Sequence, residues 1–82
     1  MAKAQSVSAA YLLGIREARA MLRQLERDGL ATIETIRRAL DNSRECLDLG
    51  FHGEARDAIK GERDFWSNQL ARLQRERAIA PA

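Results

Sequence analysis

The sequence predicts an all-α fold, in which an antiparallel helical hairpin and a third helix form a three-helix bundle. Three successive segments carry apolar residues at three- and four-residue steps, which is the period of an amphipathic helix. Glycines separate the segments at Gly29 and around Gly50, and the only proline, Pro81, lies next to the end of the sequence. Because the body of the chain holds no helix-breaking proline, we expect three helices in a single domain over residues 1–82.

The first helix is expected from residue 8 to residue 28, with Ser8 as its N-cap and Gly29 as its left-handed C-terminal cap. One third of its circumference is apolar, at about 100° per residue. That arc consists of Tyr11, Gly14, Ile15, Ala18, Met21, Leu22 and Leu25. The opposite side, here called the basic face, is a row of guanidinium groups about 16 Å long. It consists of Arg16, Arg19, Arg23 and Arg27.

The second helix is expected from residue 31 to residue 49 and ends at Gly50. Its core-facing row consists of Ile33, Ile36, Leu40 and Leu47, with Ala39, Ser43 and Cys46 beside it. The short connection at Gly29 predicts that this helix lies antiparallel beside the first as an αα-hairpin. The side away from the apolar arc is an acidic row formed by Glu34, Asp41, Glu45 and Asp48. Arg38 has the spacing to pair with Glu34 and Asp41 in this row.

The third helix is expected from residue 54 to residue 78, after a bend between Gly50 and Gly53. Gly61 lies inside this segment, so the helix either continues through it or breaks there. The predicted apolar arc consists of Ala55, Ala58, Ile59, Phe65, Trp66, Leu70 and Leu73. Glu62 and Gln69 fall near the middle of that arc, where burial of a carboxylate without a partner costs several kcal/mol.

Two interpretations of this polar inner face stay open. In the first, an arginine or a backbone donor satisfies Glu62, and Trp66 packs against the hairpin. In the second, one copy of the chain covers this face only in part, and a second molecule meets the residues Glu62, Phe65, Trp66 and Gln69. The small core of an 82-residue chain and this mixed face together predict a homodimer.

Composition argues against several functional classes. The chain has 14 basic and 12 acidic residues, which gives a net charge of +2. Cys46 and His52 are each the only residue of their type, so neither a disulfide nor a metal cluster is expected. No nucleophile–base pair or glycine-rich phosphate loop is visible, and we expect no enzymatic activity and no cofactor. The chain contains neither an apolar run of 18 residues nor a secretory signal at its start, so the expected location is cytoplasmic and away from membranes.

The charged rows also allow two interpretations. They can form a solvated, salt-bridged surface, or they can favour association with a second copy or with another protein. The basic face could alternatively follow the phosphates of a nucleic acid. The low net charge and the acidic row of the second helix argue against that alternative.

The segment from Gly61 to Leu70 (GERDFWSNQL), together with Gly14 to Arg19 (GIREAR), resembles small helical proteins of tailed phages and prophages of proteobacteria. The similarity extends from about Tyr11 to Leu70. Small phage proteins of this kind often act stoichiometrically, by covering a host protein that serves in defence or regulation. The resemblance therefore implies an accessory protein that binds a host protein in the host cytoplasm, and it transfers no functional residues.

The sequence thus predicts a non-enzymatic protein-binding module. Nucleic-acid binding through the basic face and a purely structural role in assembly are the alternatives. The residues expected to meet a partner are Arg16, Arg19, Arg23, Arg27, Glu62, Phe65, Trp66 and Gln69.

Overall fold

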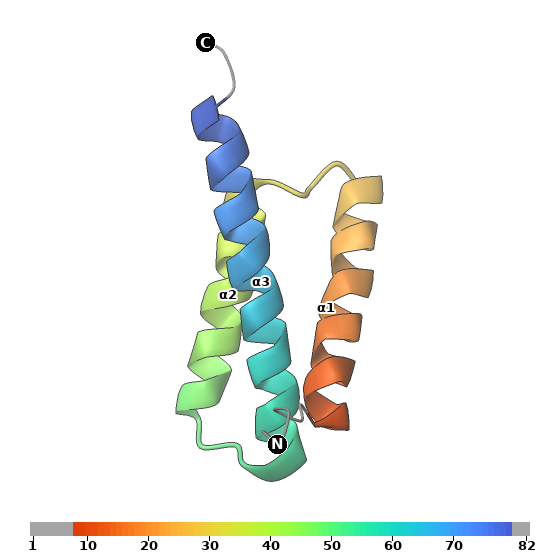
Figure 1. Cartoon of the computed structure of the whole chain (residues 1–82), viewed down its shortest axis with the longest axis vertical. Coiled ribbons are helices and arrows are strands. Elements are labelled where there is room, and N and C mark those ends of the chain that lie inside the picture. The colour runs from red at the N-terminus through yellow and green to blue at the C-terminus, as the bar shows by residue number, and fades with distance from the viewer. Residues whose placement is uncertain (1–7, 80–82) are drawn as a thin grey trace, which may run out of the picture.

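A computed structural model describes residues 8–79 and confirms the all-α fold. Three helices follow one another along the chain, and Figure 1 shows them as an up-down-up bundle. Helix α1 spans Ala9–Arg27, α2 spans Ile33–Asp48 and α3 spans Gly53–Ile79. The predicted ranges differ from these bounds by no more than two residues at any end.

Both ends of α1 are closed by local hydrogen bonds, as the sequence predicts. The Ser8 side chain accepts a hydrogen bond of 3.0 Å from the backbone N–H of Tyr11. At the other end Gly29 adopts a positive φ of 73°, and the N–H of Leu30 donates to the carbonyl of Leu25 at 2.8 Å. This is the Schellman arrangement, in which a residue in the left-handed conformation follows the helix and satisfies its last carbonyls.

Helix α2 begins two residues later than predicted because Thr32 is its N-cap. The Thr32 hydroxyl accepts a hydrogen bond of 3.2 Å from the backbone N–H of Thr35. Thr32 therefore satisfies one of the donors that a helix start leaves free. Gly50, with a φ of 89°, follows the end of α2 as predicted.

Helix α3 continues through Gly61 without a break. A Cβ atom at Gly61 would overlap the carbonyl oxygen of Tyr11 in α1, and one at Gly14 would overlap the carbonyl oxygen of Ala58 in α3. The two glycines thus allow the backbones of α1 and α3 to touch. Gly61 in α3 therefore allows close packing of the two helices and does not kink α3.

Helix α3 holds the other two helices together. It packs against both α1 and α2, whereas no Cα atom of α1 lies within 8 Å of a Cα atom of α2. The predicted hairpin is therefore antiparallel (Figure 1), but its two helices are not the close backbone neighbours that the short connection suggested. Between the two helices lies a hollow that is lined by Ala18 of α1, Ala39 of α2 and Trp66 of α3.

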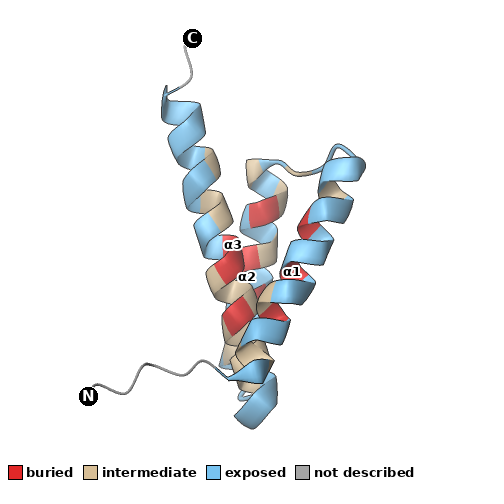
Figure 2. Cartoon of the chain, turned by 45° about the vertical axis from the view of Figure 1, so that its right-hand side comes forward, coloured by how far each residue is buried: buried red, intermediate tan, exposed pale blue. Residues whose placement is uncertain are grey.

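The core lies at mid-height of the bundle, where all three helices contribute (Figure 2). Its buried apolar members are Ala18, Leu22, Ile36, Leu40, Phe65 and Trp66. Beyond the core, the last two turns of α3 project past the other helices and are exposed (Figure 2). None of the helices in the described part of the chain is long and apolar enough to cross a membrane.

Candidate functional site

The basic face lies on the outside of α1, as predicted. All four of its arginines are exposed, and none forms an ion pair with any residue between 8 and 79. Arg27 donates a hydrogen bond of 2.7 Å to the Gln24 side chain. The guanidinium carbon of Arg19 lies 5.9 Å from the centre of the Phe65 ring, within the range of a cation–π contact. The face therefore offers four guanidinium groups that no carboxylate of the described residues neutralises.

Two leucines extend the basic face towards the start of α1. Leu12 and Leu13 are 52% and 47% exposed. Together with Ala9 and Arg16 they line a shallow apolar depression on the helix surface. The outer side of α1 is thus amphiphilic, with leucines near its N-terminal end and guanidinium groups along its length. This mixture of apolar and arginine side chains is common where proteins bind one another.

A second feature is the groove that opens where α1 and α2 diverge. It has a volume of about 260 Å³. Its floor is Glu62 and Trp66 of α3. Its walls are formed by Glu17, Ala18 and Met21 from α1 and by Ala39, Asn42 and Ser43 from α2.

The electrostatics of this groove centre on Glu62. Its side chain is half-buried and has no hydrogen bond or ion pair to any residue that the structure describes. Burial raises the pKa of the Glu62 carboxyl above its ordinary value of 4.5, and the negative charge of Glu17 raises it further. The first interpretation of the sequence, in which a donor satisfies Glu62, does not hold within residues 8–79.

Gln69 lies two turns further along the same side of α3. Its side-chain oxygen Oε1 is buried and has no hydrogen-bond partner among the described residues. A buried polar atom without a partner costs about 1–3 kcal/mol. The polar positions that the sequence marks on the inner face of α3 are therefore the positions that the fold leaves unsatisfied.

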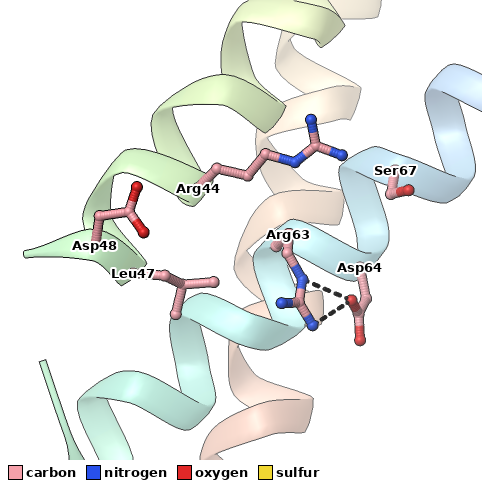
Figure 3. A pocket seen from close by; sticks show the side chains of 6 residues that line it. All are labelled: Arg44, Leu47, Asp48, Arg63, Asp64 and Ser67. Carbon is pink, nitrogen blue, oxygen red and sulfur yellow. Dashed lines mark hydrogen bonds and ion pairs between the residues drawn. The ribbon is translucent and has the colours of Figure 1, made fainter. Parts of the chain in front are cut away.

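A third hollow, of about 540 Å³, lies between α2 and α3 (Figure 3). Its lining residues are Arg44, Leu47, Asp48, Arg63, Asp64 and Ser67. Arg63 pairs with Asp64 at 2.9 Å, while Arg44 extends from α2 across the hollow (Figure 3). The lining contains two arginines and two aspartates, so its formal charges balance.

Asp64 also connects α3 to α1. The Tyr11 hydroxyl donates a hydrogen bond of 2.5 Å to Oδ2 of Asp64. This bond raises the pKa of Tyr11 above its ordinary value of 10.0; burial and the charge of Asp64 act in the same direction, while Arg63 opposes them. Asp64 is thus a structural link, and no pattern in the sequence indicated its pairing with a residue 53 positions away.

The structure does not bring the eight predicted partner-binding residues onto one surface. Phe65 and Trp66 are buried in the core, with exposed fractions of 8% and 3%, and their rings meet edge to face. They therefore serve the fold of a single copy and offer little area to a partner. Glu62 faces the groove, and Gln69 lies further along α3 on the same side. Arg16, Arg23 and Arg27 are on the outer side of α1. Arg19 is also exposed, but it lies at the border with α3, where its guanidinium carbon is 5.9 Å from the centre of the Phe65 ring.

Sequence reasoning missed the groove walls and the two leucines. Met21 was placed in the buried arc of the first helix, but it is 56% exposed at the edge of the groove. Leu12 and Leu13 fall outside that arc. Their position in the sequence therefore already indicated that the bundle leaves them exposed. In the described part of the chain, no group of three His, Cys, Asp or Glu residues could hold a metal ion. His52 lies exposed in the turn before α3, where its Nδ1 is 3.3 Å from the carbonyl oxygen of Gly50.

Comparison with known proteins finds no matching family model, no matching curated protein and no matching solved structure.

Proposed function

We propose that this chain is a non-enzymatic protein-binding module whose outer α1 surface binds an acidic partner. The observation that carries the proposal is the amphiphilic outer side of α1, where four arginines without an ion pair to residues 8–79 adjoin two half-exposed leucines. Arginine is weakly hydrated and binds carboxylates through two parallel hydrogen bonds, which suits it to protein interfaces. Leu12 and Leu13 take the anchoring role that the sequence assigned to Phe65 and Trp66, because those two rings are buried.

The biological setting that we propose follows from the resemblance of the sequence to small phage and prophage proteins. In that setting the chain is an accessory protein in the host cytoplasm, and it acts by covering a host protein of defence or regulation. A stoichiometric binder needs an exposed surface and no reaction centre. The outer side of α1 meets this requirement.

Nucleic-acid binding through the same arginines is the second candidate. On the basic face no ion pair forms with any residue that the structure describes, and this favours nucleic-acid binding, since guanidinium groups that are free to bind carboxylates are equally free to bind phosphates. A homodimer that serves assembly is the third candidate, because the acidic row of α2 is also free of ion pairs within residues 8–79 and complements the basic face.

The deciding experiment compares partner capture by the wild-type chain and by the double variant Arg19→Glu/Arg23→Glu. The matched control is Glu45→Lys/Asp48→Lys, which reverses two charges of the exposed acidic row of α2. Circular dichroism establishes that all three proteins are folded. We expect the first variant to lose the host protein that the wild type and the control retain. Equal capture by all three would overturn the assignment to the basic face.

Salt titration separates the two classes of macromolecule. If the four arginines contact phosphates, log K for a DNA or RNA duplex falls with log salt with a slope of about −0.9 per contact. Binding of an acidic protein also weakens as salt is added. If the partner is a protein, however, the chain should bind neither the DNA duplex nor the RNA duplex, even at low salt. Static light scattering at micromolar concentration tests the homodimer, because a monomer has a mass of 9.2 kDa and a dimer has twice that mass.

A further inference from the structure

The groove between α1 and α2 is an unfilled position in the bundle. Helix α3 packs against both other helices, while α1 and α2 stay apart along the opposite side. Trp66 blocks the bottom of this opening and is itself only 3% exposed. Met21, more than half exposed at the edge, leaves an apolar rim uncovered.

The charge of the groove is one-sided. Among residues 8–79 its lining contains two carboxylates, Glu17 from α1 and Glu62 from α3, and no basic residue. The α2 wall contributes the neutral polar residues Asn42 and Ser43. Neither carboxylate forms an ion pair in the described part of the chain. A half-buried carboxylate beside a second one, with no counter-charge, is an unfavourable arrangement that a cation would relieve.

We propose that this groove receives one arginine side chain from an amphipathic helix of a different protein. The inference rests on the proposed function, because it names the partner chemistry for a second surface of the same protein-binding module. A volume of about 260 Å³ accommodates one long side chain but not a helix. The partner helix therefore lies across the rims at Met21 and Asn42 and inserts a single residue.

Arginine fits this groove better than lysine does. Its planar fork of five N–H donors can reach carboxylates on two different helices together with the amide oxygen of Asn42. Its aliphatic stem can lie along Ala18 and Ala39, which are small enough to leave that space. The weaker hydration of the guanidinium group also lowers the cost of moving the charge out of water.

Trp66 makes the test direct, because it is the only tryptophan of the chain and lies in the groove floor. The probes are three capped, alanine-based helical peptides of about 18 residues, long enough to form helix in water. They differ only at one central position, which is arginine, lysine or the uncharged isostere citrulline. Titration into the full chain follows Trp66 fluorescence. We expect the arginine peptide to bind at least about tenfold more tightly than the citrulline peptide, as for hydrogen bonds to charged groups.

Two variants locate the binding site. Glu62→Gln should remove the preference for arginine over citrulline, while Glu45→Gln, on the outside of α2, should leave that preference unchanged. The Arg19→Glu/Arg23→Glu variant should also keep it, because the basic face is separate from the groove. Equal binding of the three peptides, absence of a Trp66 response, or an equal effect of Glu62→Gln and Glu45→Gln would overturn the inference.

A second copy of the chain is the competing occupant. If it filled the groove, the wild type alone would form a dimer in light scattering, and Glu62→Gln would abolish that dimer. This outcome would overturn the assignment to a different protein. In another outcome, the peptides fail to bind while the chain still captures a host protein in a way that depends on Arg19 and Arg23. That result would overturn the groove inference alone and leave the proposed function in place.

Discussion

Two glycines determine how closely α1 and α3 approach each other. Gly14 faces the Ala58 carbonyl, and Gly61 faces the Tyr11 carbonyl. The sequence placed Gly14 on the buried arc of its helix but left the role of Gly61 undecided, because an interior glycine has the same appearance at a kink and at a close contact. Only the position of the neighbouring helix distinguishes the two, and that position is a property of the fold.

The first prediction concerns Gly14→Ala. In an isolated helix this change would stabilise the chain by about 1 kcal/mol, because alanine is the better helix former. Here the new Cβ would overlap the Ala58 backbone, so α1 must move away from α3. We expect a loss of about 1–3 kcal/mol, as for other overpacked sites, measured by urea unfolding. A gain in stability would contradict the close contact.

The second prediction concerns Glu62→Gln. The pKa of Glu62 is raised in the folded state by burial and by Glu17, so the folded chain binds a proton more tightly than the unfolded chain does. The stability from protonated Glu62 is therefore complete below pH 4.5, its ordinary pKa, and is lost as the pH rises through the raised value.

Unfolding by urea at a series of pH values checks this sign. The wild type should lose stability relative to Glu62→Gln as the pH rises from 4.5 towards 7. At pH 7 the variant should be at least as stable as the wild type. A variant that is clearly less stable than the wild type at pH 7 would mean that the ionised carboxylate has a stabilising partner.

At the scale of elements, capping residues explain where each helix begins and ends. Ser8, Gly29 and Gly50 have the expected roles, because their side chains or backbone preferences act locally and can be recognised without knowledge of the fold. The predicted start of α2, at residue 31, lies two residues too early. The Thr32 hydroxyl decides the boundary, since it binds the free N–H of Thr35.

The third prediction concerns the Thr32 cap. Thr32→Ala leaves the N–H of Thr35 without its acceptor and should cost about 1 kcal/mol of stability. The matched control is Thr35→Ala. That change keeps the backbone donor and removes only the contact of 3.0 Å between the two hydroxyl oxygens. Thermal unfolding of the two variants should show a clearly larger fall in Tm for Thr32→Ala; equal falls would argue against the cap.

At the scale of the whole molecule, α3 determines the arrangement of the bundle. The apolar periods predicted three helices and most of the buried residues, including Leu22, Ile36 and Leu40. They could not predict the gap between α1 and α2, because that gap depends on the volume of Trp66 and on the glycine contacts that draw α1 towards α3. In the sequence, only Glu62, a carboxylate in an apolar arc, indicated the groove.

The fourth prediction concerns Trp66, which lies where all three helices meet. Trp66→Ala should cost about 3–5 kcal/mol, a large fraction of the stability of a small domain, and should unfold the three helices together. Far-ultraviolet circular dichroism during urea unfolding measures the loss. The control is Phe51→Ala, an aromatic residue that is 44% exposed outside the core; its effect should stay below about 1 kcal/mol. If Trp66→Ala does not fold at all, Trp66→Phe supplies the comparison.

The separation of α1 from α2 has a consequence for how this chain can be divided. The segment from Asp28 to Thr32 joins two helices whose backbones do not touch, so it acts as a tether. Doubling the length of such a tether costs only about 0.6 kcal/mol. A cut there would separate the first helix from a fragment that contains α2 and α3. The two pieces could re-associate through the close contacts at Gly14 and Gly61, as the two halves of a split reporter do.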